Sequence, residues 1–440
     1  MLNLPSFKLQ ALLDDSEVST FSSSERMIYW TIILTPIWWL MGIQTLFYPA
    51  VIISLLAIHF DWNQIVTEGL PTYVWAWLIM SIAMLWTAIL GLNDMGFSLL
   101  PAAAAVVTFL KSYFLIFACL ALPFWSQVRT QVITRAVAWM ASGYLVTIAV
   151  EIIMLTLKIG GSGFLPPLAR LIPGDKSSLR VDLAFPSSFF GLPIPRTVLY
   201  TPDPPILGLC ALLCFIICLR EPDRRLRTLA LVGSVSALVV SASRSALVLL
   251  PFALLIGVFF QSGLFRQLSL WLASTTFLLC SMLELTIEEL LQKPSEALNK
   301  TRDNAASSLI ERELVVRKTL EAWQASPWIG WGVIRGSVNL YEDAYIGLGS
   351  FSTYSAVLYL HGIVGFIALI CAMALTLWYA YSAAIRGGSN CIWAFASLIA
   401  LYIACNATPL SWMAVYLWFF FVWLGAALFE AQQSNVSSSH

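Results

Sequence analysis

Apolar runs of roughly 20 residues, separated by short polar turns, make up most of this chain. An α-helix needs a run of about this length to cross the hydrocarbon core of a bilayer. The pattern therefore predicts an all-α integral membrane protein with about 12 transmembrane helices. The predicted spans are residues 27–43, 44–60, 71–92, 98–124, 132–158, 203–219, 227–242, 245–262, 266–285, 353–380, 390–406 and 409–430.

Two polar segments interrupt the apolar pattern, and both are too long to be simple turns. The first, residues 159–202, is rich in proline, which restricts φ and favours an ordered loop. The second, residues 286–352, starts as a charged helix and passes a Pro/Gly/Trp turn at Ser326–Gly332. The chain is thus predicted to divide into an N-terminal cytoplasmic tail (1–26), helices 1–5 (27–158), a first long loop (159–202), helices 6–9 (203–285), a second, partly helical long loop (286–352), helices 10–12 (353–430) and a C-terminal cytoplasmic tail (431–440).

The composition agrees with a membrane protein and argues against several other functions. Of the 440 residues, 59% are hydrophobic and 11% are charged, whereas a soluble domain has about 25% charged residues. The formal net charge of +0 gives no basis for nucleic-acid binding. The cysteines lie in apolar runs without His or carboxylate partners at metal spacing, and no phosphate-loop or hydrolase motif occurs in a supportive context. We therefore expect no metal site and no cofactor.

The distribution of Lys and Arg over the short loops predicts which helix ends are cytoplasmic. The most basic short loop is REPDRRLR, residues 220–227, and basic short loops remain in the cytoplasm. With an even number of spans, both termini are then cytoplasmic as well. Both long loops and the turn around Arg244 fall together on the external face.

Arg244 and Arg196 are the arginines best placed for chemistry on that face. Arg244 lies in VSASRSALVLLP between two apolar runs, and Arg196 lies in the first long loop near the start of the helix at residue 203. An arginine at a bilayer edge is costly unless it snorkels, is paired or faces a wet cavity. Its guanidinium also matches phosphate oxygens bidentately. Arg244 is therefore either a snorkelling anchor at the end of a span or a clamp for an anionic ligand.

Three further sets of ionisable groups have more than one interpretation. Lys111 and Glu151 lie inside predicted spans, so they form either an interhelical ion pair or part of a proton or substrate pathway. His361 lies about two turns into the helix that starts at residue 353 and is either a core histidine or a site residue. Glu342 and Asp343 are adjacent carboxylates that bind a cation, act as a base or form a solvated loop edge.

The second long loop and the helix after it carry a recognisable combination of motifs. SSLIERELVVRKTLEAWQASPWIGWG, followed by GSFSTYSAVLYLHGIVGF, resembles the signature region of the O-antigen ligase/O-antigen polymerase superfamily. The matching positions are Ser308 and Arg312 at the start of the signature, Pro327, Gly330 and Gly332 in its turn, Gly362 and Gly365 in the following helix, Arg244 in the SRS segment, and Arg196 in the arginine-rich approach to residue 203, with Asp203 where Asn is frequent.

This resemblance implies a bacterial inner-membrane enzyme whose active face is periplasmic. The implied reaction is a metal-independent, inverting glycosyl transfer from an undecaprenyl-diphosphate-linked glycan to a sugar acceptor. Fixed arginines would stabilise the negative charge on the leaving lipid diphosphate. The expected catalytic residues are Arg244, Arg196, Arg312 and His361, and the expected substrate-binding residues are Arg180, Arg317, Trp328, Trp331 and Asp343. The tryptophans stack on sugar faces or anchor the loop at the membrane interface.

One position departs from the family pattern. Where the family commonly has a histidine thought to help deprotonate the acceptor hydroxyl, this chain has Phe351, in GSFST. Phenylalanine has no group that can accept a proton. His361, Glu342 or Asp343 then takes over this role, or catalysis proceeds by charge stabilisation, or the chain is impaired.

The resemblance leaves three functions to separate. The GSFSTY turn favours a polymerase that extends repeat units of O-antigen, capsule or exopolysaccharide, alongside other polysaccharide assembly proteins. The alternative within the family is a ligase that moves finished glycan to lipid A-core. The alternative of another class is a transporter or flippase, which predicts internal repeats and broken spans at mid-membrane. No convincing repeat is visible, although Lys111 and Glu151 would suit it.

Overall fold

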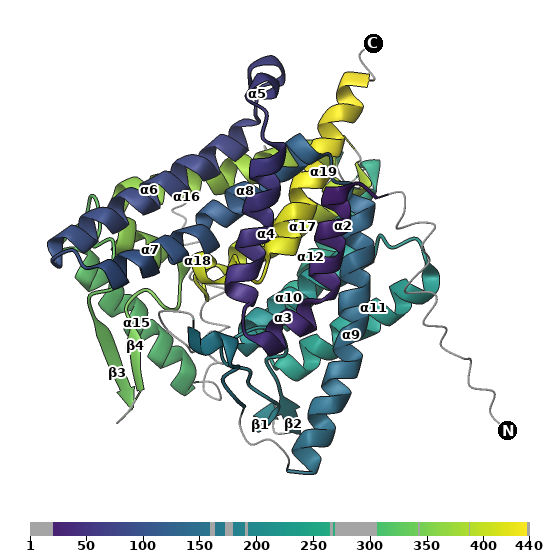
Figure 1. Cartoon of the computed structure of the whole chain (residues 1–440). Helices are drawn as coiled ribbons and strands as arrows, with labels where there is room; N and C mark the ends of the chain where they lie inside the picture. Colours follow the sequence, from purple (N-terminus) through teal and green to yellow (C-terminus); the bar gives the residue numbers. More distant parts are fainter. Residues whose placement is uncertain are drawn as a thin grey trace.

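The computed structural model describes residues 21–158, 163–171, 179–189, 192–264, 267–268, 306–341, 344–386 and 388–437. These residues form mainly α-helices, with two small antiparallel hairpins (Figure 1). The helices are α2 (Ser23–Ile33), α3 (Thr35–Met41), α4 (Gln44–His59), α5 (Trp62–Glu68), α6 (Thr72–Asp94), α7 (Leu99–Lys111), α8 (Tyr113–Ser126), α9 (Thr130–Thr156), α10 (Pro204–Cys218), α11 (Arg224–Ser241), α12 (Arg244–Gln261), α15 (Ala306–Trp323), α16 (Thr353–Ile385), α17 (Ser389–Ala404), α18 (Leu410–Met413) and α19 (Trp418–Ser437). The strands are β1 (Phe185–Phe189), β2 (Leu192–Arg196), β3 (Ser337–Tyr341) and β4 (Ala344–Gly347).

Each predicted span within the described residues coincides with a helix or with a pair of helices joined at a break. Five helical stretches among the described residues are long and apolar enough to cross a membrane, if α7 and α8 are taken together as Leu99–Ser126. A sixth span results if α4 and α5, bent by 75°, are counted together. Two other apolar helices, α10 and α17, are shorter. The span predicted at residues 266–285 lies outside the described residues, so the total of about 12 stays a prediction.

The predicted span at residues 98–124 corresponds to one candidate span, Leu99–Ser126, which is divided into two helices. Ser112 separates α7 from α8 with φ −106° and ψ −122°, values outside the helical region. Its hydroxyl lies 3.0 Å from the carbonyl oxygen of Ser411. A contact with a residue so distant in sequence leaves no trace in the apolar pattern, which runs through the break.

The described parts of the two polar segments lie at the same end of the helical bundle. In β1–β2, Phe185 pairs with Arg196, and in β3–β4, Ser337 pairs with Gly347. Figure 1 shows both hairpins and α15 at the end opposite α5 and the C-terminal end of α19. The shared end agrees with the predicted common face of the two long loops. Its assignment to the periplasm stays a prediction.

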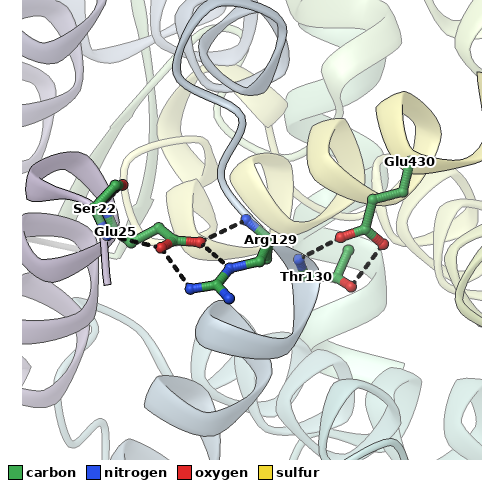
Figure 2. Close-up of polar contacts among 5 residues, drawn as sticks. All are labelled: Ser22, Glu25, Arg129, Thr130 and Glu430. Atoms are coloured by element: carbon green, nitrogen blue, oxygen red, sulfur yellow. Dashed lines mark hydrogen bonds and ion pairs between the residues drawn. The ribbon is translucent and has the colours of Figure 1, made fainter. Parts of the chain in front are cut away.

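A network of carboxylates surrounds the start of α9 at the other end of the bundle (Figure 2). Glu25 accepts hydrogen bonds from Nε and Nη2 of Arg129, at 2.7 and 2.8 Å, and from the backbone N–H of Arg129 and Ser22. Glu430 accepts from the backbone N–H and the hydroxyl of Thr130, at 2.8 and 2.9 Å. Carboxylates suit a helix N-terminus because its first N–H groups lack partners within the helix. The network joins α2, α9 and α19.

Candidate active site

The Ser326–Gly332 turn fills a break in α16. Gly362 has φ 62° and ψ −166°, so the helix is interrupted there. Four backbone hydrogen bonds connect the turn with the interrupted helix: Trp331 N to Tyr359 O (2.9 Å), Gly332 N to Leu360 O (2.7 Å), Ile363 N to Pro327 O (2.9 Å) and Val364 N to Trp328 O (3.2 Å). A break in an apolar helix is tolerated where other groups satisfy the freed backbone. The turn provides those groups.

Glycine is required where the turn and helices approach most closely. A Cβ on Gly362 would lie 2.2 Å from the carbonyl oxygen of Trp328. A Cβ on Gly332 would lie 2.0 Å from the carbonyl oxygen of Thr87 in α6. These contacts explain why the Pro-x-x-Gly-x-Gly turn carries small residues. They also fix the position of the loop against α6 and α16.

A cavity of about 680 Å³ lies beside this junction. Its walls come from α6, α7, α16, residues 332–334, the segment from β4 to Phe351, and residues 409–412. Most of the lining is apolar. Asp203 and His361 are the ionisable residues among the described side chains that line it.

His361 is held at the cavity wall by Thr87. Its Nδ1 lies 2.6 Å from the Thr87 hydroxyl oxygen, and the side chain is 3% exposed. The Thr87 hydroxyl donates to the backbone carbonyl of Ala83 or Met84, each at 3.0 Å. The hydroxyl oxygen therefore accepts from Nδ1–H, which leaves the lone pair of the neutral ring on Nε2.

Asp203 precedes α10 but does not cap it with its side chain. A capping aspartate normally accepts from the backbone N–H of the second or third helical residue. The first two positions here are Pro204 and Pro205, which have no N–H, and the N–H of Ile206 donates to the backbone carbonyl of Asp203. Asp203 is among the residues that line the cavity. Burial raises the pKa of this carboxyl above its ordinary value, although Arg196 and Arg312 favour the charged form.

Arg196, at the end of β2, is held by backbone contacts with the end of α11. Its Nε donates to the carbonyl of Ser241 at 3.1 Å, and the next residue, Thr197, donates its N–H to Val240 O. The Thr197 hydroxyl donates to the carboxylate of Glu151 in α9. Burial lowers the pKa of Arg196, Asp203 opposes this, and Arg244 and Arg312 lower it further. Arg244 and Arg312, which come from separate elements, are therefore close enough to Arg196 to interact with it electrostatically.

Arg244 and Arg312 approach this group from two helices. Arg244 is the first residue of α12 and is exposed, as expected for a cation available to a ligand. Arg312 lies in α15, and its guanidinium carbon is 5.3 Å from the ring centre of Phe351. Phe351 also lines the cavity. The residue that replaces the expected histidine thus supports an arginine and forms part of the cavity wall.

Residues 229–370 match the model of a family described as O-antigen ligase. This region of the chain, residues 229–370, is similar to an O-antigen ligase domain. This result confirms the resemblance to the O-antigen ligase/polymerase superfamily. No curated protein matches the chain. The matched region and the apolar helices together indicate a multi-pass membrane protein, and the match supports glycan transfer of the O-antigen ligase/polymerase type in general.

The matched region contains Arg244, Arg312 and His361, whereas Arg196 and Asp203 precede it. The structure brings the three arginines together with Asp203, and it places His361 on the wall of the same cavity. Asp203 was not among the expected site residues. The two prolines after it were the available signal, because they remove the N–H of the second helical residue, one of the two donors that a capping carboxylate normally uses.

Other expected site residues lie away from the cavity lining. Arg180 is 2.7 Å from Asp182, and Arg317 is 3.8 Å from Glu321 on an exposed face of α15. Trp328 is 66% exposed. Trp331 donates its indole N–H to Ala322 O, and its ring faces the guanidinium of Arg335. Glu342 and Asp343 lie outside the described residues.

Proposed function

We propose that this protein transfers a glycan from an undecaprenyl-diphosphate donor to a sugar acceptor at the periplasmic face of the bacterial inner membrane. The observation that carries the proposal is the cluster of Arg196, Arg244 and Arg312 beside the cavity. These arginines come from β2, α12 and α15, so the fold must form before they meet. No nucleotide-binding motif is needed for a donor that is already activated by a diphosphate.

The arginines would act on the leaving group. When the acceptor oxygen attacks the anomeric carbon, the bond to the lipid diphosphate breaks and negative charge develops on the diphosphate oxygens. Guanidinium groups stay protonated and bind such oxygens through paired N–H donors. Fixed charges in a partly buried site stabilise this developing charge without reorganisation. The apolar walls of the cavity suit the lipid or the sugar faces next to it.

The product is proposed to be a surface polysaccharide extended by repeat units. The second candidate is transfer of finished glycan to lipid A-core, which the description of the matched family as a ligase favours. A deletion strain separates the two. Single-repeat products support a polymerase, whereas full-length chains that remain unattached support a ligase.

The arginine cluster is tested with Arg244→Ala. We expect product formation to be lost while the protein inserts and accumulates, because an exposed side chain at a helix start contributes little to folding. Product is read on polysaccharide gels from a strain that lacks its own copy, and binding of undecaprenyl diphosphate is measured in nanodiscs. Arg225→Ala is the matched control, since Arg225 is an exposed arginine at the opposite end of α11. Wild-type activity in Arg244→Ala would refute the clamp.

A further inference from the structure

We propose that Asp203 is the catalytic base that takes the proton from the acceptor hydroxyl, in place of a histidine at Phe351. The inference rests on the proposed glycosyl transfer and deepens it. Two geometric observations carry it: Asp203 lines the cavity, and its side chain makes no capping hydrogen bond to the helix that it precedes.

The local sequence explains why this carboxylate is available. Asp223, at the start of α11, shows the ordinary arrangement, in which the carboxylate accepts the N–H of Arg225 at 2.9 Å. At α10, prolines occupy the two positions after Asp203, and the N–H of Ile206 is taken by the backbone carbonyl of Asp203. The side chain of Asp203 therefore makes no capping hydrogen bond to α10. Asp203 is instead among the residues that line the cavity.

The charges around Asp203 suit a base that works beside a diphosphate. Arg196 on β2 and Arg312 on α15 act on it directly, Arg244 on α12 acts on Arg196, and His361 on α16 lines the same cavity. Burial raises the pKa of Asp203, and the arginines oppose this without cancelling it. A carboxylate with a raised pKa is a stronger base than an ordinary aspartate, yet it is ionised once the pH exceeds that pKa.

The other described candidates fit the role less well. Phe351 has no basic atom, and its ring faces the guanidinium of Arg312. His361 is 3% exposed, and its described side-chain partner is Thr87 rather than any of the clustered arginines. The base must be close to the anomeric carbon, and therefore close to the cations that hold the diphosphate. Asp203 meets this condition.

The proposed step moves one proton and exchanges one bond at the anomeric carbon. The acceptor hydroxyl gives its proton to a carboxylate oxygen of Asp203 while its oxygen forms a bond to the anomeric carbon. The bond between that carbon and the diphosphate oxygen breaks, and its electron pair leaves with the lipid diphosphate. Asp203 later releases the proton to water, which restores the carboxylate.

The experiment separates donor binding from transfer in Asp203→Asn. Binding is measured with undecaprenyl diphosphate in nanodiscs, and transfer is measured in membranes that contain the endogenous lipid-linked glycan. We expect binding at least as tight as in the wild type, because a negative charge beside the diphosphate has been removed. Transfer should fall by about 100-fold or more, the usual contribution of a general base. Asp223→Asn is the control and should leave both unchanged.

Two readouts exclude a merely structural role. Wild-type transfer should decline as the pH falls through the raised pKa of Asp203, and the residual activity of Asp203→Asn should lack this decline. Formate added to Asp203→Ala should restore part of the transfer, because a small carboxylate can occupy the vacated space and take the proton. Should Asp203→Asn not accumulate, Asp203→Glu and the formate-treated Asp203→Ala provide the same test.

Each outcome decides one of the two proposals. Unchanged transfer in Asp203→Asn, or loss of both binding and transfer without formate rescue, overturns the base assignment. If His361→Gln loses transfer while Asp203→Asn keeps it, the base is His361 instead. Failure of the wild-type protein to bind undecaprenyl diphosphate and to transfer glycan overturns the glycosyl transfer itself, whereas unaltered transfer in Arg244→Ala refutes only the arginine clamp.

Discussion

Phe351 has a defined role at the scale of a single residue, although it cannot act as a base. Its ring lies 5.3 Å from the guanidinium carbon of Arg312 and forms part of the cavity wall. Arginine binds the face of an aromatic ring through the quadrupole of the ring. The ring therefore restrains a long, flexible cation that would otherwise lose side-chain entropy when a diphosphate binds.

We expect Phe351→Leu to weaken binding of undecaprenyl diphosphate about fivefold, since a cation–π contact contributes roughly 1 kcal/mol. Leucine retains an apolar wall but offers no aromatic face. Binding is measured by titration in nanodiscs, with Phe97→Leu as the control because Phe97 is 66% exposed and does not line the cavity. Phe351→His should give no gain in transfer if Asp203 already supplies the base. An increase would indicate that the base is missing from this chain.

At the scale of elements, the sequence predicts the helices more completely than their breaks. The positions of the helices follow from apolar runs, which depend on residues close in the chain. The interruptions at Ser112 and Gly362 depend on segments far away in sequence, namely residue 411 and the Ser326–Gly332 turn. The site divides in the same way. Motifs predicted the arginines, whereas the contact of Arg312 with Phe351 and the place of Asp203 beside Arg196 and Arg312 emerge only when distant elements meet.

Gly362→Ala is expected to destabilise the protein by about 3 kcal/mol or more, because its φ and ψ lie in a region that is essentially restricted to glycine. The added Cβ would also clash with the carbonyl oxygen of Trp328. The break would close or shift, and the four bonds to the turn would be lost. The measurements are accumulation in membranes and the melting temperature in nanodiscs. Gly143→Ala, in α9, should be tolerated, because its Cβ would meet only the Tyr200 hydroxyl at 3.9 Å.

At the scale of the whole molecule, α9 connects the carboxylate network with the arginine cluster. Thr130 at its start binds Glu430, and Glu151 near its end accepts a hydrogen bond from Thr197, next to Arg196. The helix rises about 1.5 Å per residue, so these two points lie roughly 30 Å apart. The network at one end should therefore contribute to stability without taking part in the chemistry at the other.

This separation predicts the behaviour of Glu25→Ala. Glu25 is 3% exposed, so its removal leaves the N–H groups that donate to its carboxylate without an acceptor. Stability should fall by about 1–2 kcal/mol rather than more, because water reaches the half-exposed guanidinium of Arg129. Transfer per folded molecule should not change. Arg26→Ala, at an exposed neighbouring position, is the control.

The effect of Glu25→Ala should also depend on pH in a defined direction. Burial alone would raise the pKa of Glu25, but the hydrogen bonds from Arg129 and Ser22 outweigh it and lower the pKa below 4.5. A carboxyl whose pKa is lower in the folded state stabilises the fold above its unfolded pKa, and this stabilisation is lost as the pH falls through the folded value. Melting temperatures of the wild type and Glu25→Ala should therefore differ at neutral pH and converge in acid. A difference that grows in acid, or a change in transfer at neutral pH, would contradict a purely structural role for this network.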